Sequence, residues 1–225
     1  MQAEDLVDTT EMYLKAVLEL EEEGAVAMRA RLAERFGHSG PTVQQTVSRM
    51  QRDDLLVVEA DRQLRFTDRG RARAMSVMRK HRLAEVFLDR VIGLDWKQVH
   101  QEACRWEHVM SDRVEALLDR LLDSPETTPY GNRLAGNLPP DAARNLVKVA
   151  TSREGRSDAT IAWIGEPLQA DVEALGDLHT LGLLPGRRVA VERRGPSILV
   201  EIDGEDGRIE LPHEIAAHLF AVSVD

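Results

Sequence analysis

The segment MRARLAERFGHSGPTVQQTVSRM, residues 28–50, decides the fold of this chain. Its first nine residues have the composition of a short helix, and Gly37 follows at the position where helices commonly end. Ser39 is a favourable N-cap for a second helix, and Pro41 lies in its first turn, where a missing N–H is tolerated. The apolar face of this second helix comprises Val43, Val47 and Met50. Two helices joined by so short a turn predict a helix-turn-helix unit.

The flanking residues extend this unit on both sides. Upstream, Asp8-Thr-Thr-Glu11 is a helix-start signal in which Asp8 caps and Glu11 closes a capping box, and apolar residues at helical spacing continue to Gly24. Downstream, two strand-like runs between residues 55 and 66 flank a short turn and predict a hairpin. A helix, a helix-turn-helix and a hairpin together predict a winged helix-turn-helix domain over residues 1–75.

Residues 76–140 predict a helical domain. One long helix is expected from Thr67 to about Ile92, and a second from Trp96 to about Leu122, with Cys104 as the candidate position of a bend. The apolar faces of these helices are candidates for a dimer interface, although they could equally form core within one chain. Those apolar residues are Val86, Phe87, Val91, Ile92, Val109 and Leu117.

The last third of the chain has a different periodicity. Residues 141–157 are expected to be a linker, with one short helix over 141–150, because the surrounding sequence is rich in Pro, Gly and Asn. Residues 158–225 predict a small β-barrel with one inserted helix at about Ala170–Leu181. The strand patterns are Thr160–Ile164, Arg187–Arg193, Ile198–Ile202 and Arg208–Leu211. The predicted fold class is therefore α+β.

Composition excludes several classes of protein. The 225 residues are 43% hydrophobic, which is enough for a packed core and excludes wholesale disorder. No apolar run has the length of a membrane span, and no secretory signal precedes the first helix, so no membrane partner is expected. A lone cysteine, Cys104, favours a reducing compartment, and we expect a cytoplasmic location.

The charge distribution predicts contact with DNA despite a net charge of −10. Residues 25–75 carry ten arginines against six carboxylates, whereas the flanking regions are acidic. Arginine suits phosphates and guanine edges, and a recognition helix needs short polar side chains at its N-terminal end. The candidate DNA-contacting residues are Thr9, Arg29, Arg31, Ser39, Pro41, Thr42, Gln45, Arg49, Arg52 and Arg62.

A second constellation predicts metal binding. His81 and Glu85 are four residues apart, and so are His100, Cys104 and His108, which places each set on one helix face. Thiolate, imidazole and carboxylate donors together suit Fe²⁺, Co²⁺, Ni²⁺ or Zn²⁺ better than Mg²⁺ or Ca²⁺. The sequence has no glycine-rich phosphate loop, nucleophile elbow or HExxH motif, so an enzyme is not predicted.

These residues lie in stretches that closely resemble the diphtheria toxin repressor and iron-dependent regulator family of metal-dependent transcriptional repressors. The matching stretches are DLVDTTEMYL (5–14), SGPT (39–42), MRKHRLAE (78–85) and EACRWEHVMSD (102–112). The resemblance is strong over residues 4–138 and concerns only the architecture in the last third, where the family has an SH3-like (FeoA-like) domain.

The resemblance implies an Fe²⁺-activated homodimeric repressor of iron-homeostasis genes, with two metal sites per chain. Its primary site would comprise Met12, Cys104, Glu107 and His108. Its ancillary site would comprise His81, Glu85 and His100, completed from the C-terminal domain, where Asp171 and Glu173 are the candidates. The adjacent anion pocket would comprise Arg82, Thr128 and Asn132. Co²⁺, Ni²⁺, Mn²⁺ or Zn²⁺ could substitute in vitro.

The resemblance also implies a mechanism and leaves alternatives. Metal would fix the first helix relative to the winged domain, and loaded dimers would bind palindromic operators, with one or two dimers per operator. Manganese sensors of the family usually have a carboxylate at the position of Cys104, so the thiol favours iron. The alternatives are a manganese- or zinc-responsive repressor, a sensor of an organic ligand, and a metalloenzyme fused to a DNA-binding module.

Overall fold

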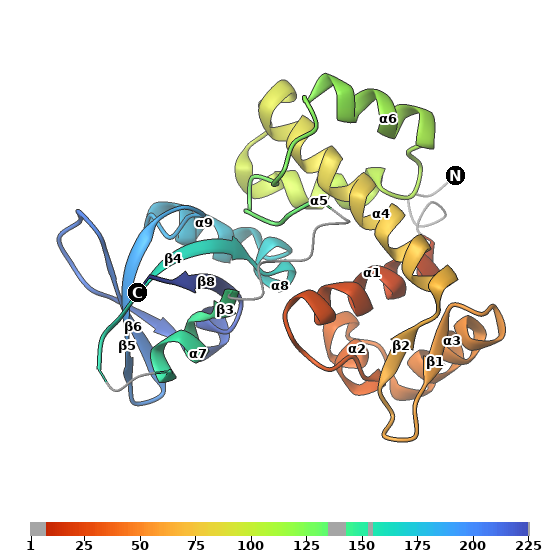
Figure 1. Ribbon diagram of the computed structural model, residues 1–225, viewed down its shortest axis with the longest axis horizontal. Helices are drawn as coiled ribbons and strands as arrows, with labels where there is room; N and C mark the ends of the chain where they lie inside the picture. Colours follow the sequence, from red (N-terminus) through yellow and green to blue (C-terminus); the bar gives the residue numbers. More distant parts are fainter. Residues whose placement is uncertain (1–7, 135–142, 153–154, 225) are drawn as a thin grey trace.

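The computed structural model describes residues 8–134, 143–152 and 155–224, which form three lobes (Figure 1). A winged-helix lobe lies at the N-terminal end, a helical lobe follows, and a lobe built on a β-sheet ends the chain. The long helix α4 (Asp68–Phe87) leads from the first lobe into the second. Among the described residues, no helix is long and apolar enough to cross a membrane.

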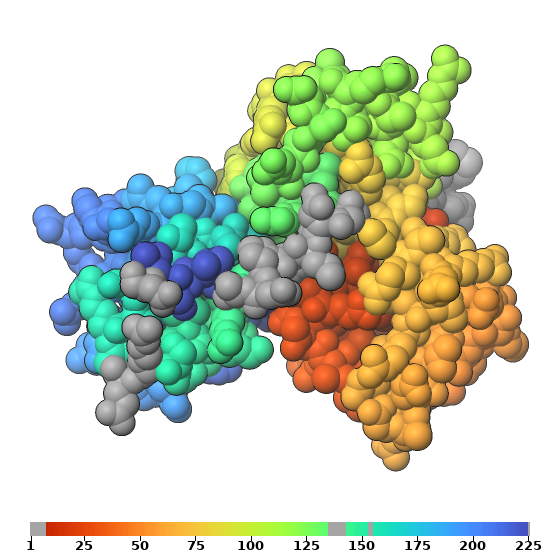
Figure 2. Space-filling view, in the orientation of Figure 1, coloured from red at the N-terminus to blue at the C-terminus, as the bar shows by residue number. Residues whose placement is uncertain are grey.

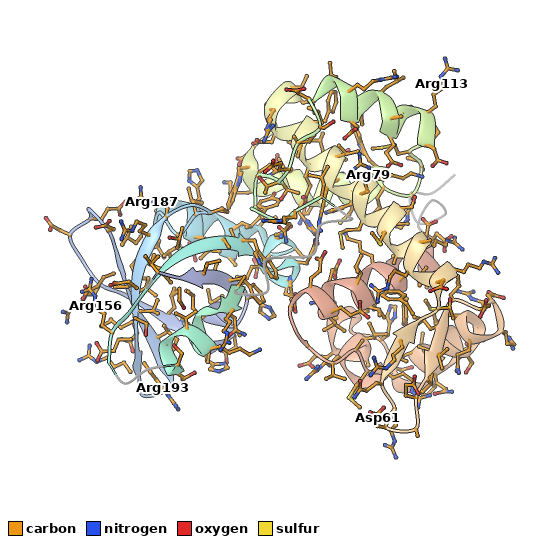
Figure 3. All side chains as sticks on the ribbon, in the orientation of Figure 1. Asp61, Arg79, Arg113, Arg156, Arg187 and Arg193 are labelled. Atoms are coloured by element: carbon orange, nitrogen blue, oxygen red, sulfur yellow. The ribbon has the colours of Figure 1, made fainter. Side chains whose placement is uncertain are left out.

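The winged-helix lobe confirms the predicted helix-turn-helix and hairpin. Asp8 caps the first helix through the amides of Thr10 and Glu11, and the Ser39 hydroxyl accepts from the amide of Thr42 to cap the third. The two strands pair antiparallel, and Asp61 lies at the tip of their hairpin (Figure 3). The elements of this lobe are α1 (Thr9–Glu22), α2 (Arg29–Phe36), α3 (Gly40–Arg52), β1 (Leu56–Val58) and β2 (Leu64–Phe66).

A tight contact sets where α4 leaves the wing. A Cβ atom on Gly70 would lie 1.8 Å from the carbonyl oxygen of Leu55, so only glycine allows this approach of helix to chain. Thr67 caps the helix at the same point, and its hydroxyl also donates to the carbonyl of Asp54. The direction of α4, and with it the position of the helical lobe, is fixed by this junction.

The helical lobe differs from the prediction in one respect. The expected helix from Trp96 to about Leu122 is two helices, α5 (Trp96–Trp106) and α6 (Asp112–Leu121), because the Ser111 hydroxyl caps a new helix by accepting from the amide of Val114. The break lies after Trp106, not at Cys104. The long preceding helix ends in a π-helical turn, η2 (Leu88–Ile92), after α4.

The C-terminal lobe is a six-stranded antiparallel sheet with the strand order β3-β8-β4-β5-β6-β7. Its strands are β3 (Ala143–Asn145), β4 (Ser157–Ile164), β5 (Arg188–Arg194), β6 (Ser197–Ile202), β7 (Ile209–Pro212) and β8 (Leu219–Ser223). Its helices are α7 (Leu146–Thr151), α8 (Glu166–Gln169), α9 (Val172–Thr180) and α10 (His213–Ala216). This sheet is consistent with the expected SH3-like domain.

Three details of the last third differ from the prediction. The sheet includes β3, which pairs with β8, so the segment 141–157 is not only a linker where the structure describes it. The short helix expected over 141–150 is α7, which begins later, and the helix expected over 170–181 is α9, preceded by the separate α8. The strand β8 is not among the predicted strands. Its residues form an apolar run, but the run follows the short helix α10 with no turn signal between them.

The sheet lobe lies against the helical lobe (Figure 2), and the two share one hydrophobic core. Tyr130 is fully buried between them, where its hydroxyl donates to the carbonyl of Trp96 and accepts from the amide of His100. Its carbonyl accepts from the amide of Ile164 in the sheet. The next residue, Gly131, has a φ of +83°, and a Cβ atom there would lie 2.1 Å from the carbonyl oxygen of Ala162. This loop therefore fixes the sheet against α5.

The candidate dimer residues divide into two groups. Val86 is fully buried within its own chain and belongs to the core, contrary to the expectation of an interface role, and Phe87 is half-buried. The remaining candidates are exposed on the helical lobe, and two further apolar side chains, Val114 and Leu121, are exposed with them. The exposed set is Val91, Ile92, Val109, Val114, Leu117 and Leu121.

Candidate metal centre

The ligand candidates of α4 and α5 meet where these two helices pack. His81 Nε2 and His100 Nδ1 both lie near Glu85 Oε1, at 2.8 and 3.1 Å. Cys104 Sγ lies 3.5 Å from His100 Nε2. One ligand atom each from His81, His100 and Cys104 lie within 4.8 Å of one another, and both imidazoles are buried. The helical spacing in the sequence thus brings these donors together.

Glu107 connects this group with the remaining candidates. Its Oε2 lies 2.6 Å from His81 Nδ1, and its Oε1 lies 3.3 Å from His108 Nε2. Met12 lines the same cleft, which has a volume of about 1110 Å³ and lies between α1, α5 and the sheet lobe. The two expected ligand sets are therefore contiguous in the structure, because Glu107 contacts a histidine from each.

Two carboxylates that sequence reasoning did not include also contact the cluster. Glu11 Oε2 lies 2.8 Å from His108 Nδ1, so the side chain expected to close the capping box reaches the cluster. Glu166, the first residue of α8, is buried with its Oε2 3.6 Å from His100 Nδ1. Neither Glu166 oxygen has a hydrogen-bond partner among the described residues. A buried oxygen without a partner fits the donor of an ion.

Asp171 and Glu173 do not occupy the place expected of them. Both are exposed, and the carboxylate of Asp171 instead caps α9 by accepting from the amides of Glu173 and Ala174. Gln169 lies one helical turn after Glu166, is fully buried, and has an Oε1 without a partner among the described residues. The structure thus points to α8, not to the start of α9, as the contribution of the sheet lobe. The sequence held one signal for this contribution: Glu166 and Gln169 are three residues apart, which places two oxygen donors on one helix face.

A lysine lies inside the cluster. Lys15, one helical turn after Met12 on α1, is only 6% exposed. Its Nζ lies 3.1 Å from Glu107 Oε2 and 3.2 Å from His81 Nδ1. Burial alone would lower the pKa of Lys15, but the negative charges of Cys104 and neighbouring carboxylates raise it well above its usual value. The side chain is therefore an ammonium.

The charges of the cluster support one another. Burial raises the pKa of the Cys104 thiol, but the positive charges of Lys15 and His100 outweigh it and lower that pKa to about 5. Burial would lower the pKa of His100, yet the adjacent Cys104 thiolate and Glu85 raise it to about 10. Lys15 and His81 lower the pKa of Glu107 to about 2 against the opposing effect of burial. At neutral pH the cluster holds a thiolate and carboxylates ready to bind a cation.

The donor set fits a transition metal. It combines a soft thiolate with imidazoles and carboxylates, which together suit the later divalent metals. The oxygens of Glu166, which have no hydrogen-bond partner among the described residues, are buried beside it. Hard cations such as Ca²⁺ would lack the shell of oxygen ligands that they require.

The predicted anion pocket contains an internal carboxylate. Arg82 is buried, and its guanidinium holds Glu22 through bonds of 2.9 and 2.5 Å. Thr128 and Asn132 are also buried, and the Asn132 side chain accepts from Gln169 at 2.9 Å. Arg82 Nε has no partner among the described residues, so one donor remains available to an anion.

The candidate DNA-contacting residues lie on the surface of the winged-helix lobe. The face of α3 opposite its buried side chains exposes Pro41, Thr42, Gln45, Arg49 and Arg52. Ser39, Arg31 and Thr9 are also exposed, and Arg62 stands in the hairpin turn with a φ of 70°. Arg29 is half-buried, with its guanidinium on the side chain of Gln44. A polar helix face with arginines at its end is what the major groove accepts.

Helix α1 connects this surface with the metal cluster. Thr10 Oγ1 accepts from Arg49 of α3 at 3.4 Å, and the next residue, Glu11, contacts His108 at 2.8 Å. Arg73 of α4 donates to Asp8 at 2.6 Å and to Glu11 at 3.1 Å, so the start of α1 is held from both sides. The position of α1 thus depends on contacts with the recognition helix and with the cluster.

Family comparisons match both N-terminal lobes. Residues 5–64 match the family described as "Iron dependent repressor, N-terminal DNA binding domain". Residues 67–134 match "Iron dependent repressor, metal binding and dimerisation domain".

Curated relatives and solved structures match nearly the whole chain. The iron-dependent repressor IdeR of Mycobacterium tuberculosis is 48% identical over 221 residues, covering 94% of this chain and 96% of the relative. The diphtheria toxin repressor of Corynebacterium diphtheriae is 45% identical over 222 residues, with coverages of 94% and 96%. A manganese-dependent transcriptional repressor in complex with manganese superposes with a TM-score of 0.82 at 29% identity, covering 96% of this chain and 100% of that one. ScaR with bound Zn²⁺ superposes with a TM-score of 0.78 at 25% identity, with coverages of 96% and 100%.

Proposed function

Because the chain belongs to the iron-dependent repressor family of metal-dependent transcriptional repressors, which are not enzymes, we propose that it represses transcription in response to Fe²⁺. The observation that supports this proposal is the thiolate–imidazole–carboxylate cluster whose residues contact α1, the helix that also contacts the recognition helix. Membership of the family supports the function of a metal-dependent repressor, and the donor atoms of the cluster favour Fe²⁺ as the metal.

We assign the ligands to two neighbouring sites. Met12, Cys104, Glu107 and His108 would hold the activating metal, and His81, Glu85 and His100 would hold the ancillary metal. Glu166 and Gln169 would complete the ancillary site from the sheet lobe, in place of Asp171 and Glu173. Arg82, Thr128 and Asn132 would hold an anion beside it.

Iron is favoured by the donors of the activating site. A thiolate and a thioether are softer ligands than the carboxylates and waters that suit Mn²⁺. The relatives of highest identity mentioned above are named for iron and for the diphtheria toxin, whereas the solved neighbours carry manganese and zinc. Mn²⁺ or Zn²⁺ as the physiological metal is the alternative that metal titration would separate.

Repression would follow from the position of α1. Met12 of α1 and the ligands of α5 would hold the metal between them, and the bound cation would supply the positive charge that joins these helices. Glu11 then keeps its contact with His108, while Thr10 accepts from Arg49 and orients the exposed face of α3. Arg73 would hold Asp8 and Glu11, the acidic residues at the start of α1, and so keep their negative charges away from the DNA phosphates. The residues of α1 thus select the conformation that binds DNA.

A dimer would present two recognition helices to a palindromic operator. The exposed apolar residues of the helical lobe, among them Ile92, Leu117 and Leu121, provide the surface for this contact. Polar and charged residues dominate ordinary exposed surfaces, so an apolar set of this kind fits an interface. One or two dimers per operator are compatible with this arrangement.

The test is selection of duplex DNA by the purified protein under anaerobic conditions. A random duplex library is selected with Fe²⁺, and binding of the winning sequence is then measured with Fe²⁺, Mn²⁺, Zn²⁺ and a chelator. We expect half-maximal activation at a lower free concentration with Fe²⁺ than with Mn²⁺, and loss of binding with chelator. Activation by Mn²⁺ at lower free concentration than Fe²⁺ would refute the metal assignment.

A further inference from the structure

Lys15 is a buried cation among the proposed ligand atoms, and the proposed function leaves it without a role. Its Nζ lies 3.1 Å from Glu107 Oε2, 3.2 Å from His81 Nδ1 and 3.7 Å from Cys104 Sγ. A lysine so deeply buried is rare, because its charge must be compensated by several partners. Those partners here are the same atoms that would bind a metal.

We propose that Lys15 is a tethered cation that competes with the divalent metal for Cys104, Glu107 and His81, and so sets the metal affinity of this chain. The inference rests on the metal binding proposed above. Metal–ligand bonds to sulfur, nitrogen and oxygen are only about 2.0–2.3 Å long. A metal bonded to these atoms would stand within a few ångströms of an ammonium that kept its place. Like charges at that distance repel strongly in a buried site, so the ammonium must leave.

The structure offers the displaced ammonium a second partner. Glu19 lies one helical turn further along α1, and its Oε1 is 3.9 Å from Lys15 Nζ. Arg35 holds Glu19 in place from α2, at 2.5 Å. Lys15 and Glu19 both line the cleft of about 1110 Å³ beside the cluster. The side chain can therefore turn from Glu107 towards Glu19 and the cleft while the backbone of α1 stays helical.

Removal of the lysine charge should tighten metal binding. Lys15→Leu removes the competing ammonium without adding a ligand atom, and we expect Co²⁺ binding about tenfold or more tighter, because a buried like charge is lost. Lys15→Arg keeps the charge and should not tighten binding. Lys97→Leu is the matched control, since it removes the same charge from the half-buried Lys97 on α5, which pairs with Asp95 at 3.6 Å.

Two measurements on the full chain test the inference. The thiolate-to-cobalt charge-transfer absorption, read in competition with a chelator, gives the Co²⁺ affinity of each variant. Thermal unfolding of chelator-treated protein gives a second readout. Without metal, Lys15→Leu should unfold at a lower temperature than wild type, because buried carboxylates lose their partner. Co²⁺ should raise the unfolding temperature of Lys15→Leu by more than it raises that of wild type.

Equal or weaker Co²⁺ affinity of Lys15→Leu would overturn the inference, and so would equal tightening in Lys97→Leu. If Lys15→Leu fails to fold without metal, acylation of Lys15 in the wild-type protein decides, read by mass spectrometry. The amine should react slowly in chelator and faster in saturating Co²⁺, and equal rates would refute displacement. Failure of wild type to bind Co²⁺ refutes the proposed function, whereas tight binding that ignores Lys15 refutes only this inference.

Discussion

Replacing Cys104 by alanine removes the softest donor of the cluster and leaves its neighbours in place. The thiol sulfur lies 3.5 Å from His100 Nε2, and ligand atoms of Cys104, His81 and His100 lie within 4.8 Å of one another. Four-ligand metal sites bind with about 10–16 kcal/mol, so one ligand contributes roughly 3 kcal/mol, or about a hundredfold in affinity. Because the pKa of this thiol is about 5, the thiolate is already formed at pH 7, and its deprotonation does not reduce that figure.

The assay is Fe²⁺-dependent binding of the selected duplex, followed by fluorescence anisotropy under anaerobic conditions. For Cys104→Ala we expect the Fe²⁺ concentration at half-activation to rise about a hundredfold, while circular dichroism stays that of wild type. Cys104→Asp is the matched control: it restores an anionic ligand of harder character, and should recover activation with Mn²⁺ more than with Fe²⁺. If Cys104→Ala reached half-activation at the same Fe²⁺ concentration as the wild-type protein, the placement of the thiol in the metal site would be refuted.

Three further predictions concern the wider site. Glu166→Gln should weaken the metal-induced rise in the unfolding temperature, because the carboxylate near His100 is lost, and an unchanged rise would exclude Glu166 as a ligand. Gly70→Ala should destabilise the protein by about 3 kcal/mol in urea unfolding, since its Cβ would overlap the Leu55 carbonyl; an unchanged midpoint would contradict this. His100 has a pKa raised from 6.5 to about 10, so its ion pair stabilises chelator-treated protein fully below pH 6.5 and is lost as pH rises towards 10. Metal binding displaces that proton, so metal affinity should rise over the same range, and a flat affinity would contradict the assignment.

Local signals in the sequence predicted most of the winged-helix lobe. Ser39 and Pro41 start α3, and Asp8 starts α1, because capping depends on residues only a few positions apart. The same holds for His100 and Cys104, whose four-residue spacing is preserved by one helix turn. Spacing on a single helix therefore transfers directly from the sequence to the site.

Contacts between distant elements could not be predicted in this way. Glu166 comes near His100 only because the sheet lobe packs on α5 through Tyr130, which no local pattern encodes. Lys15 resembles an ordinary helix cation in the sequence, although its spacing from Met12 places both on one face of α1. The single helix predicted from Trp96 to about Leu122 is two helices in the structure, because capping by Ser111 outweighs local helix propensity.

The coupling between metal and DNA is the central claim, and one thermodynamic cycle tests it directly. The affinity of the wild-type protein for the selected duplex is measured with saturating Fe²⁺ and with chelator, and the Fe²⁺ affinity is measured with and without the duplex. We predict that Fe²⁺ tightens DNA binding by a factor of about 5–150, and that DNA tightens Fe²⁺ binding so that the gains, multiplied over all bound metals, give the same factor, as linkage requires. Equal DNA affinity with Fe²⁺ and with chelator would contradict the account.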